Sequence, residues 1–219
     1  MAVTPEEVIK VMNYPQRTPE WLKARSCRLT ASVFGSAANH NPRCKPRNLL
    51  MNTLWDTFKG NICTEYGTKN EPVAVKVYED FMKKIRKSTD KISFYYPGLI
   101  ICEKYPWLAV SPDGLTTLNN IRFLLEIKCP FSKKFYPHIP HYYYDQIQGI
   151  MAILQLPYCD FVVWTYDKTQ IRRYNFDMEY WKKVLFPRLE NYFMNEYLPR
   201  IILKEEGKLQ KGELEPTIH

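Results

Sequence analysis

The stretch AVSPDGLTTLNNIRFLLEIKCPFSKKF, residues Ala109–Phe135, sets charged side chains inside a run that is otherwise largely apolar. Asp113 lies in a Pro-Asp-Gly turn, and Glu126 and Lys128 are two residues apart in the segment LLEIKC. Side chains two apart in a β-strand point to the same side, so Glu126 and Lys128 share one face while their apolar neighbours point to a core. A hairpin-like return after the turn would bring Asp113 beside Glu126. The stretch therefore predicts two carboxylates and an ammonium group at one place.

This set of charges suits phosphodiester hydrolysis. Carboxylate oxygens hold Mg²⁺ together with several of its waters, and the metal polarises a phosphate and acidifies the attacking water, which a lysine can orient. The alternative is a surface ion pair on an edge strand, which explains Glu126 and Lys128 but not the turn that carries Asp113. Because Asp, Glu and Lys also occur at this spacing by chance, the rest of the sequence must support the metal site.

Length and charge favour one domain that binds a polyanion. The 219 residues are 45% hydrophobic and 15% aromatic, which is enough for a buried core and excludes global disorder. Lys and Arg outnumber Asp and Glu by 31 to 23, a formal charge of +8, so nucleic acid is the first partner to consider. The alternative is a basic protein without such a partner. We expect a single domain over residues 1–203 and a polar, frayed tail over residues 204–219.

The cysteines and the N-terminus indicate a reducing compartment. The six cysteines are far apart in the sequence and include no CxxC pair, so local spacing supports neither a zinc site nor an iron–sulfur cluster. The first residues carry acids where a signal peptide needs bases, and no later stretch reaches the length of a membrane span. We therefore expect a soluble, intracellular protein of the cytoplasm or a host nucleus.

Periodicity and turn residues predict an α/β fold, with a central mixed sheet flanked by helices and a helical N-terminal part. Helices are predicted at Pro5–Asn13, Thr18–Arg25, Thr30–Ala38, Pro46–Phe58, Gly67–Lys87, Pro140–Leu156 and Glu179–Leu198. Strands are predicted at Ile92–Tyr96, Leu99–Glu103, Leu108–Val110, Ile121–Lys128, Tyr158–Tyr166 and Gln170–Phe176. The segment FYPHIPHYYYDQ could be read as a base-stacking platform or a histidine metal site, but Pro140 interrupts the helical spacing of its histidines, and packing on the sheet explains its tyrosines.

The segments SPDGL and LLEIKCPF, together with PEWLKARSCRLTASVFG, resemble the PD-(D/E)XK nuclease superfamily. Within it they are most similar to the branch of phage lambda exonuclease and the viral recombinases and alkaline nucleases. The similarity runs in order from Trp21 to about Gln148 and implies a restriction-endonuclease-like core. It also implies that Asp113 and Glu126 bind Mg²⁺, which Mn²⁺ can replace, and that Lys128 lies beside the nucleophilic water.

The resemblance adds two residues to this site. The block YGTKNEPVA matches a family helix that contributes a further glutamate, here Glu71, toward the metal; an ordinary solvated helix carboxylate is the alternative. The family's glutamine after the lysine corresponds to Gln146 within YYYDQIQG. Gln148 competes for this role, but residues two apart on a helix point about 200° apart, so only one can face the site. We choose Gln146.

The resemblance also implies a pocket for the 5′-phosphate of the degraded strand, formed by Arg25, Ser32, Ser111 and Lys134. A guanidinium, hydroxyls and helix-terminal N–H groups are suitable receptors for a terminal phosphate. Helix capping is the alternative for Arg25 and for Ser32. Lys134 departs from the family pattern, which has an arginine there, and a lysine lacks the fork geometry that selects a phosphate end.

The implied activity is Mg²⁺-dependent hydrolysis of duplex DNA from 5′ ends, which leaves 3′ single strands for recombination or repair. The resemblance further implies a ring-shaped homotrimer and a single-strand annealing protein as partners. Two alternatives remain open: a structure- or sequence-specific endonuclease on the same core, and a DNA-binding module without turnover. Carboxylates that face phosphate argue against the binding module, because like charges repel.

Overall fold

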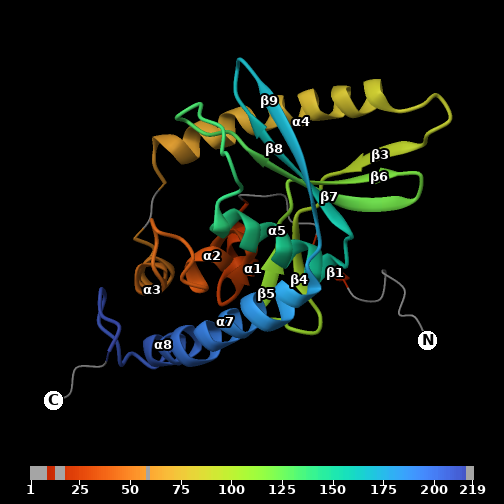
Figure 1. Ribbon diagram of the computed structural model, residues 1–219. Helices are drawn as coiled ribbons and strands as arrows, with labels where there is room; N and C mark the ends of the chain where they lie inside the picture. The colour runs from red at the N-terminus through yellow and green to blue at the C-terminus, as the bar shows by residue number, and fades with distance from the viewer. Residues whose placement is uncertain (1–8, 13–17, 58–59, 216–219) are drawn as a thin grey trace, which may run out of the picture.

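The computed structural model describes residues 9–12, 18–57 and 60–215 (Figure 1). The helices are α1 (Pro19–Arg25), α2 (Phe34–Ala37), α3 (Pro46–Trp55), α4 (Ile62–Ile85), α5 (His141–Leu154), α6 (Met178–Tyr180), α7 (Phe186–Asn191) and α8 (Leu198–Glu205). The strands are β1 (Ile9–Met12), β2 (Leu29–Thr30), β3 (Ile92–Tyr95), β4 (Leu99–Cys102), β5 (Leu108–Val110), β6 (Gly114–Leu118), β7 (Ile121–Lys128), β8 (Tyr158–Trp164) and β9 (Thr169–Asn175). The predicted α/β class is confirmed.

The strands of the described chain form a five-stranded and a four-stranded sheet. The larger sheet has the order β3-β6-β7-β8-β9, in which β7 and β8 are parallel and the other neighbours antiparallel. The smaller sheet has the order β1-β4-β5-β2. The chain passes from the smaller sheet to the larger one through the turn between β5 and β6, which carries Asp113. This crossing places the acidic turn beside β7, the central strand of the larger sheet.

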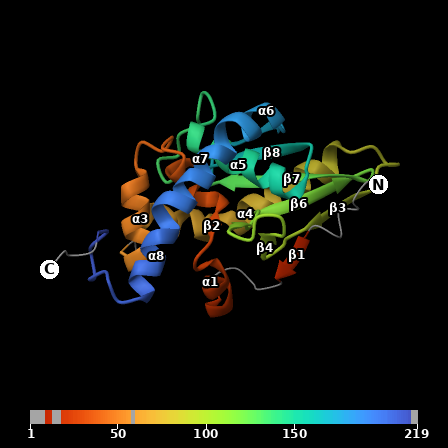
Figure 2. The same ribbon diagram turned by 90° about the horizontal axis from the view of Figure 1, so that it is seen from below.

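Helices cover both faces of the larger sheet (Figures 1 and 2). On one face, Ala74, Tyr78 and Met82 of α4 pack against alternate residues of β7. On the other face, α5 packs against the residues between them, of which Leu124 is one. Because the sheet is covered twice, alternate residues of β7 point into two different cores, and residues 123–127 of this strand are buried on both faces.

The smaller sheet positions α1. Leu99, Ile101 and Ala109 are buried on one face of β4 and β5, and Trp21 and Ala24 of α1 pack against them. Thr18 caps the helix by accepting a hydrogen bond from the backbone N–H of Trp21 at 3.2 Å. The fold therefore places α1 directly over the strands that lead to the acidic turn.

Consecutive helical elements run from Met178 to Glu205, and we call this segment the C-terminal helix. It changes to π-helical geometry at Trp181–Leu185 and again at Tyr192–Tyr197. Pro187 and Pro199 lie shortly after these two segments, and each lacks the N–H that an α-helical hydrogen bond needs. Its buried residues, such as Leu185 and Leu189, pack against α5 and α2 in the main core.

Three expectations are wrong. Ile9–Met12, expected to be helical, is strand β1, which pairs with β4; the other residues of this predicted helix lie outside the described ranges. The segment GLTTL was not expected to be a strand, yet it forms β6, because its pairing with β3 and β7 outweighs the weak signal of a glycine and two threonines.

The expected frayed tail is also wrong for the part that the structure describes. Helix α8 runs past the predicted domain boundary at residue 203, and Leu209 and Leu214 beyond it are buried. The backbone carbonyl of Glu213 accepts a hydrogen bond from the indole of Trp55 at 2.8 Å. Two leucines among charged residues are enough to anchor this segment to α3.

All six cysteines are free thiols, and Cys102 and Cys159 are buried. Among the described helices, none combines the length and the apolar character that crossing a bilayer would require.

Candidate active site

The β6–β7 hairpin brings the acidic turn to the middle of β7. Gly114 pairs with Leu125, so Asp113 lies opposite Glu126. The Oδ2 atom of Asp113 accepts a hydrogen bond from the backbone N–H of Ile127 at 2.7 Å. This bond fixes the orientation of the Asp113 carboxylate next to Glu126.

Glu126, Lys128 and Gln146 form a hydrogen-bonded group on the face of β7 that α5 covers. Lys128 Nζ donates to Glu126 Oε1 at 2.6 Å and to Gln146 Oε1 at 3.1 Å, and Gln146 Nε2 donates to Glu126 Oε1 at 2.6 Å. Glu126 is only 1% exposed and lies on a central strand. The alternative of a surface ion pair on an edge strand is therefore wrong.

Gln146, and not Gln148, faces this group. The side chain of Gln148 donates to the carbonyl of Asn175 at 2.9 Å and accepts from the backbone N–H of Asp177 at 2.8 Å. It thereby ties α5 to the end of β9 on the other side of the helix. The two glutamines point in different directions, as the helical spacing required.

Glu71 reaches the same region from α4. A Cβ atom at Gly67, one turn before it, would lie 4.0 Å from the carbonyl oxygen of Cys129, so the beginning of α4 lies over the end of β7. The charge of Glu71 contributes to raising the pKa of Glu126 and of Cys129, after burial as the main cause in both. Three carboxylates therefore act on one another near the end of β7.

Burial dominates the electrostatics of the group. Burial and, after it, the charge of Asp113 raise the pKa of Glu126, Lys128 opposes the change, and the result is a pKa of about 8. Burial alone would lower the pKa of Lys128, but the charges of Glu126 and Asp113 attract the ammonium group and raise it. Lys128 therefore stays charged, while the Glu126 carboxyl, with its raised pKa, holds a proton at neutral pH until another cation takes its place.

The donor set fits a divalent cation with a preference for oxygen. Glu126 Oε2 is buried and has no hydrogen-bond partner among the described residues, although a buried carboxylate oxygen without a partner is costly. A cation bound by this oxygen would satisfy it and offset the repulsion from Asp113. Hard cations such as Mg²⁺ take such carboxylate ligands.

A second polar group lies between α1 and the acidic turn. The guanidinium of Arg25 lies 4.1 Å from the ring centroid of Trp21, whose indole N–H donates to Ser111 Oγ at 3.4 Å. Arg25 Nη2 also donates to Thr30 Oγ1 at 3.1 Å, and this hydroxyl is 3.3 Å from Ser32 Oγ. Three of the four expected phosphate-pocket residues are therefore linked to one another, and Ser111 is two residues from Asp113.

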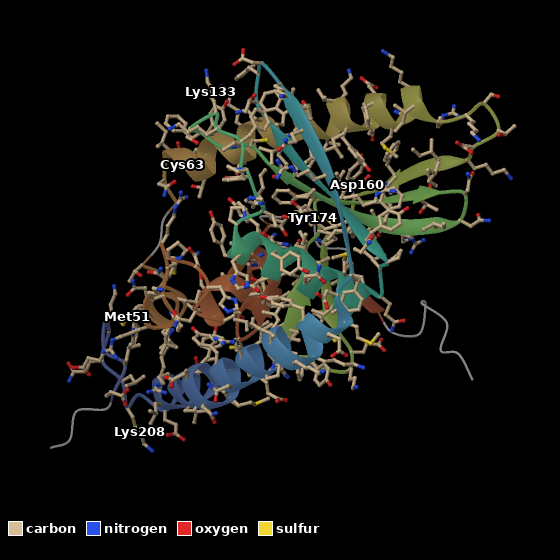
Figure 3. All side chains as sticks on the ribbon, in the orientation of Figure 1. Met51, Cys63, Lys133, Asp160, Tyr174 and Lys208 are labelled. Atoms are coloured by element: carbon tan, nitrogen blue, oxygen red, sulfur yellow. The ribbon has the colours of Figure 1, made fainter. Side chains whose placement is uncertain are left out.

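Burial lowers the pKa of Arg25 to about 10, because desolvation disfavours the charged guanidinium. An arginine in this environment suits an anionic ligand. Lys134 is not brought into this group: it is exposed on the loop after β7 and, within the described ranges, makes no hydrogen bond to the other three. Figure 3 labels its neighbour Lys133 on this loop, which contacts the start of α4 through Phe131 and Tyr66.

The sequence interpretation missed the parts that Thr30, Tyr143 and Trp21 play in these two groups. Trp21 does pack against the smaller sheet, but it also connects Arg25 with Ser111. Tyr143 places its ring 4.8 Å from Lys128 Nζ. Its position three residues before Gln146 on a helix was the available signal, because residues three apart share a face.

Histidines gather on the opposite side of α5. His40 Nδ1 is 2.9 Å from Asp145 Oδ2, and Tyr180 donates to Asp145 Oδ1 at 2.5 Å and lies 2.7 Å from His141 Nε2. The rings of His40 and His141 are stacked, with centroids 3.9 Å apart and planes 10° apart. A ring nitrogen directs its lone pair within the ring plane, so these parallel rings do not aim at one ion. The cluster ties α5 to α2 and α6.

Comparison with solved structures places this geometry in a known fold. An alkaline exonuclease from Laribacter hongkongensis superposes with a TM-score of 0.61 and 24% identity, over 87% of this chain and 98% of that one. Its complex with dAMP gives a TM-score of 0.62 and 23% identity, over 88% and 100%. A phage-related exonuclease from Haemophilus somnus 129PT gives 0.51 and 14% identity, over 81% and 96%. The expected nuclease fold is confirmed.

Viral proteins are similar in sequence. The chain is 26% identical over 170 residues to "Uncharacterized protein R354" of Acanthamoeba polyphaga mimivirus, and 27% identical over 165 residues to "Protein D345L" of African swine fever virus (strain Badajoz 1971 Vero-adapted). These alignments cover 70% and 63% of this chain but only 30% and 46% of the relatives. The YqaJ-like viral recombinase domain matches residues 20–157, more than half of the chain. The protein therefore belongs to the YqaJ-like viral recombinase family, within the PD-(D/E)XK nucleases.

Proposed function

We propose that this protein is a divalent-metal-dependent deoxyribonuclease that degrades duplex DNA from 5′ ends and leaves 3′ single strands for recombination or repair. One observation carries the proposal: Glu126 has a buried carboxylate oxygen to which no described residue donates a hydrogen bond, beside Asp113 and a charged Lys128. A pure DNA-binding module would gain nothing from such a costly arrangement at a surface meant for phosphate. The family match and the fold support the same activity.

The residues divide the work of hydrolysis. Asp113 and Glu126, with Glu71 close by, would hold Mg²⁺ or Mn²⁺, which supplies polarisation of the phosphate and a more acidic water. Lys128 orients the attacking water and offsets charge that develops on the phosphate. Gln146 holds both Lys128 and Glu126 in place through its two hydrogen bonds. The position of α5 therefore controls the geometry of the charged groups.

The group around Arg25 would bind the phosphate at the end of the substrate strand. Arg25, Ser32 and Ser111 supply the donors, and Trp21 holds two of them in register. Lys134 would add a positive charge from the loop after β7, without the geometric selectivity of an arginine. This pocket supports attack from a 5′ end. A homotrimer around the DNA and a single-strand annealing partner are further parts of the proposal that rest on family resemblance.

The decisive experiment compares DNA ends. The purified protein is incubated with Mg²⁺ and labelled linear duplexes that carry a 5′-phosphate or a 5′-hydroxyl, and with closed circular duplex. We expect progressive loss of the linear DNA alone, fastest with a 5′-phosphate, and release of mononucleotides. Nicking of the circle would support the endonuclease alternative instead. Absence of cleavage with both Mg²⁺ and Mn²⁺ would favour the binding module.

Arg25→Ala should slow the degradation of 5′-phosphorylated ends by about tenfold to a hundredfold, because a charge-assisted hydrogen bond to phosphate is lost. Ends with a 5′-hydroxyl should be affected much less. Initial rates on the two substrates measure the difference. Lys23→Ala, an exposed residue of the same helix, is the matched control and should change neither rate. Equal losses on both ends in Arg25→Ala would contradict the phosphate-pocket role.

A further inference from the structure

A cavity of about 620 Å³ lies outside the candidate active site, between the α2–α3 region and the C-terminal helix. Figures 1 and 2 both show α3 beside α8, which frame this part of the molecule. Leu50, Val184 and Leu214 supply apolar parts of its wall. No residue of the metal centre or the phosphate pocket lines it. Its volume lies within the range of pockets that hold small molecules, roughly 300–1,000 Å³.

At one end of the cavity, the N–H groups of the Arg200 guanidinium are engaged in ion pairs and hydrogen bonds. Arg200 Nη2 is 2.7 Å from Glu215 Oε1, and Arg200 Nη1 is 3.1 Å from Glu196 Oε2. The guanidinium also donates to the backbone carbonyls of Asn195 at 3.0 Å and of Leu214 at 3.4 Å. Because Arg200, Glu196 and Glu215 are paired with one another, contacts within the protein occupy the charged groups at this end.

The opposite side carries positive charge that is less engaged. Arg47 of α3 and Lys183 and Arg188 of the C-terminal helix are exposed and line the cavity. Lys183 forms an exposed ion pair with Glu179, a type of contact worth little in water. Arg188 donates one hydrogen bond, from Nη1 to the carbonyl of Ala38 at 3.3 Å. In total four basic and two acidic side chains line the cavity, so its field attracts anions.

Tyr192 provides an independent sign of a ligand. The residue lines the cavity and is only 3% exposed, and its hydroxyl is buried without a hydrogen-bond partner in the described part of the chain. Burial raises the pKa of this phenol, with the charges of Tyr197, Cys44 and Glu196 adding to the effect, so the hydroxyl keeps its proton. A buried donor without an acceptor is costly, and a polar atom of a ligand would remove that cost.

We infer that this cavity binds a nucleoside 5′-phosphate, with the phosphate near Arg47 and the basic side chains of the C-terminal helix, and the base against the apolar wall beside Tyr192. An inorganic anion would leave most of the volume and the apolar wall unused. A purely apolar ligand would leave the cationic side and the buried hydroxyl unsatisfied. A nucleoside phosphate has both the anionic end and the flat body with polar edge atoms that these features require. The inference does not depend on the nuclease activity.

Isothermal titration of the full-length protein with thymidine 5′-monophosphate, in EDTA to remove divalent metals, tests this site. Every protein in this series, including the reference called wild type, carries Arg25→Ala, so that the proposed pocket for a terminal phosphate does not bind the nucleotide. We expect saturable binding of one molecule per chain, and much weaker binding of thymidine. The double variant Arg47→Glu/Lys183→Glu should bind at least about tenfold more weakly. Lys45→Glu/Lys182→Glu changes the net charge equally at neighbouring exposed positions that do not line the cavity, and should bind as the wild type does.

Absence of saturable binding to the wild type, or equal binding by the two double variants, would overturn the inference. A 5′-phosphorylated oligothymidine added as competitor identifies the source of the nucleotide. Competition would assign the site to the end of a DNA strand, and lack of competition to a free nucleotide; each outcome supports a nucleoside phosphate as the ligand.

Tyr192→Phe separates a ligand-binding role from a structural one. Because no described residue forms a hydrogen bond with the hydroxyl, its removal should leave Tm unchanged or raise it. Affinity for thymidine 5′-monophosphate should fall about fivefold, the effect of one lost hydrogen bond. A lower Tm with unchanged affinity would show that the hydroxyl serves the fold and would overturn its assignment to the ligand.

Discussion

Glu126→Gln is expected to reduce DNA cleavage about a thousandfold or more, while the protein stays folded. The amide keeps an oxygen that can accept from Lys128 and Gln146, so the hydrogen bonds at Oε1 survive. It removes the negative charge and the unbonded oxygen that would hold the metal. Metal assistance is worth several kcal/mol, and each 1.4 kcal/mol corresponds to about tenfold in rate. Single-turnover cleavage of linear duplex measures the loss.

Stability without metal provides the second readout for this variant. The pKa of Glu126 is raised from 4.5 to about 8 in the folded protein, so its proton stabilises the fold fully below pH 4.5. That contribution is lost as the pH rises through 8. In EDTA, the wild type should therefore lose stability between pH 5 and pH 9 relative to Glu126→Gln. Glu65→Gln, which changes an exposed carboxylate of α4, should match the wild type in both assays. Near-normal turnover in Glu126→Gln would remove this residue from the site.

The affinity for divalent metal is expected to rise by up to about a hundredfold between pH 6 and pH 8. Below its pKa of about 8, Glu126 is protonated, so a metal ion must displace that proton to bind. Each unit of pH below the pKa then weakens apparent binding about tenfold, provided one proton is released per ion. Activity at limiting Mg²⁺ should follow the same course and favour alkaline conditions.

Calorimetric titration with Mn²⁺ in two buffers of different ionisation enthalpy measures both quantities. The buffer dependence of the heat gives the protons released, which should approach one per ion at pH 6 and approach zero at pH 9. Affinity that is the same at pH 6 and pH 8 would contradict the proposed protonation of the site.

Local patterns predicted the centre of the fold well. The alternation in β7 placed Glu126 and Lys128 on one face, and the Pro-Asp-Gly turn placed Asp113 opposite Glu126. Helix geometry separated Gln146 from Gln148. These features depend on residues that are neighbours along one strand, one turn or one helix, so periodicity alone is sufficient to find them.

The burial of the site was not predictable in this way. Alternation shows which residues share a face but not that α5 covers the face of Glu126, because that contact joins segments far apart in the sequence. The sequence also failed to identify β1 and β6 as strands for the same reason, because pairing with other strands and not intrinsic propensity stabilises them. Trp21, Arg25 and Ser111 meet only because α1 packs on the smaller sheet.

Few substitutions in one turn of helix α5 should be compatible with an intact active site. Asp145, Gln146 and Gln148 lie within four consecutive residues of this helix. Asp145 contacts His40 after α2 and Tyr180 of α6, Gln146 bonds to the charged groups of β7, and Gln148 bonds to the end of β9. A substitution that moves this turn of the helix toward one of the three partners must disturb the hydrogen bonds to the other two. Substitutions at Asp145 or Gln148 can therefore impair hydrolysis without touching a reacting group, and variation that preserves activity is confined to residues of this helix outside that turn.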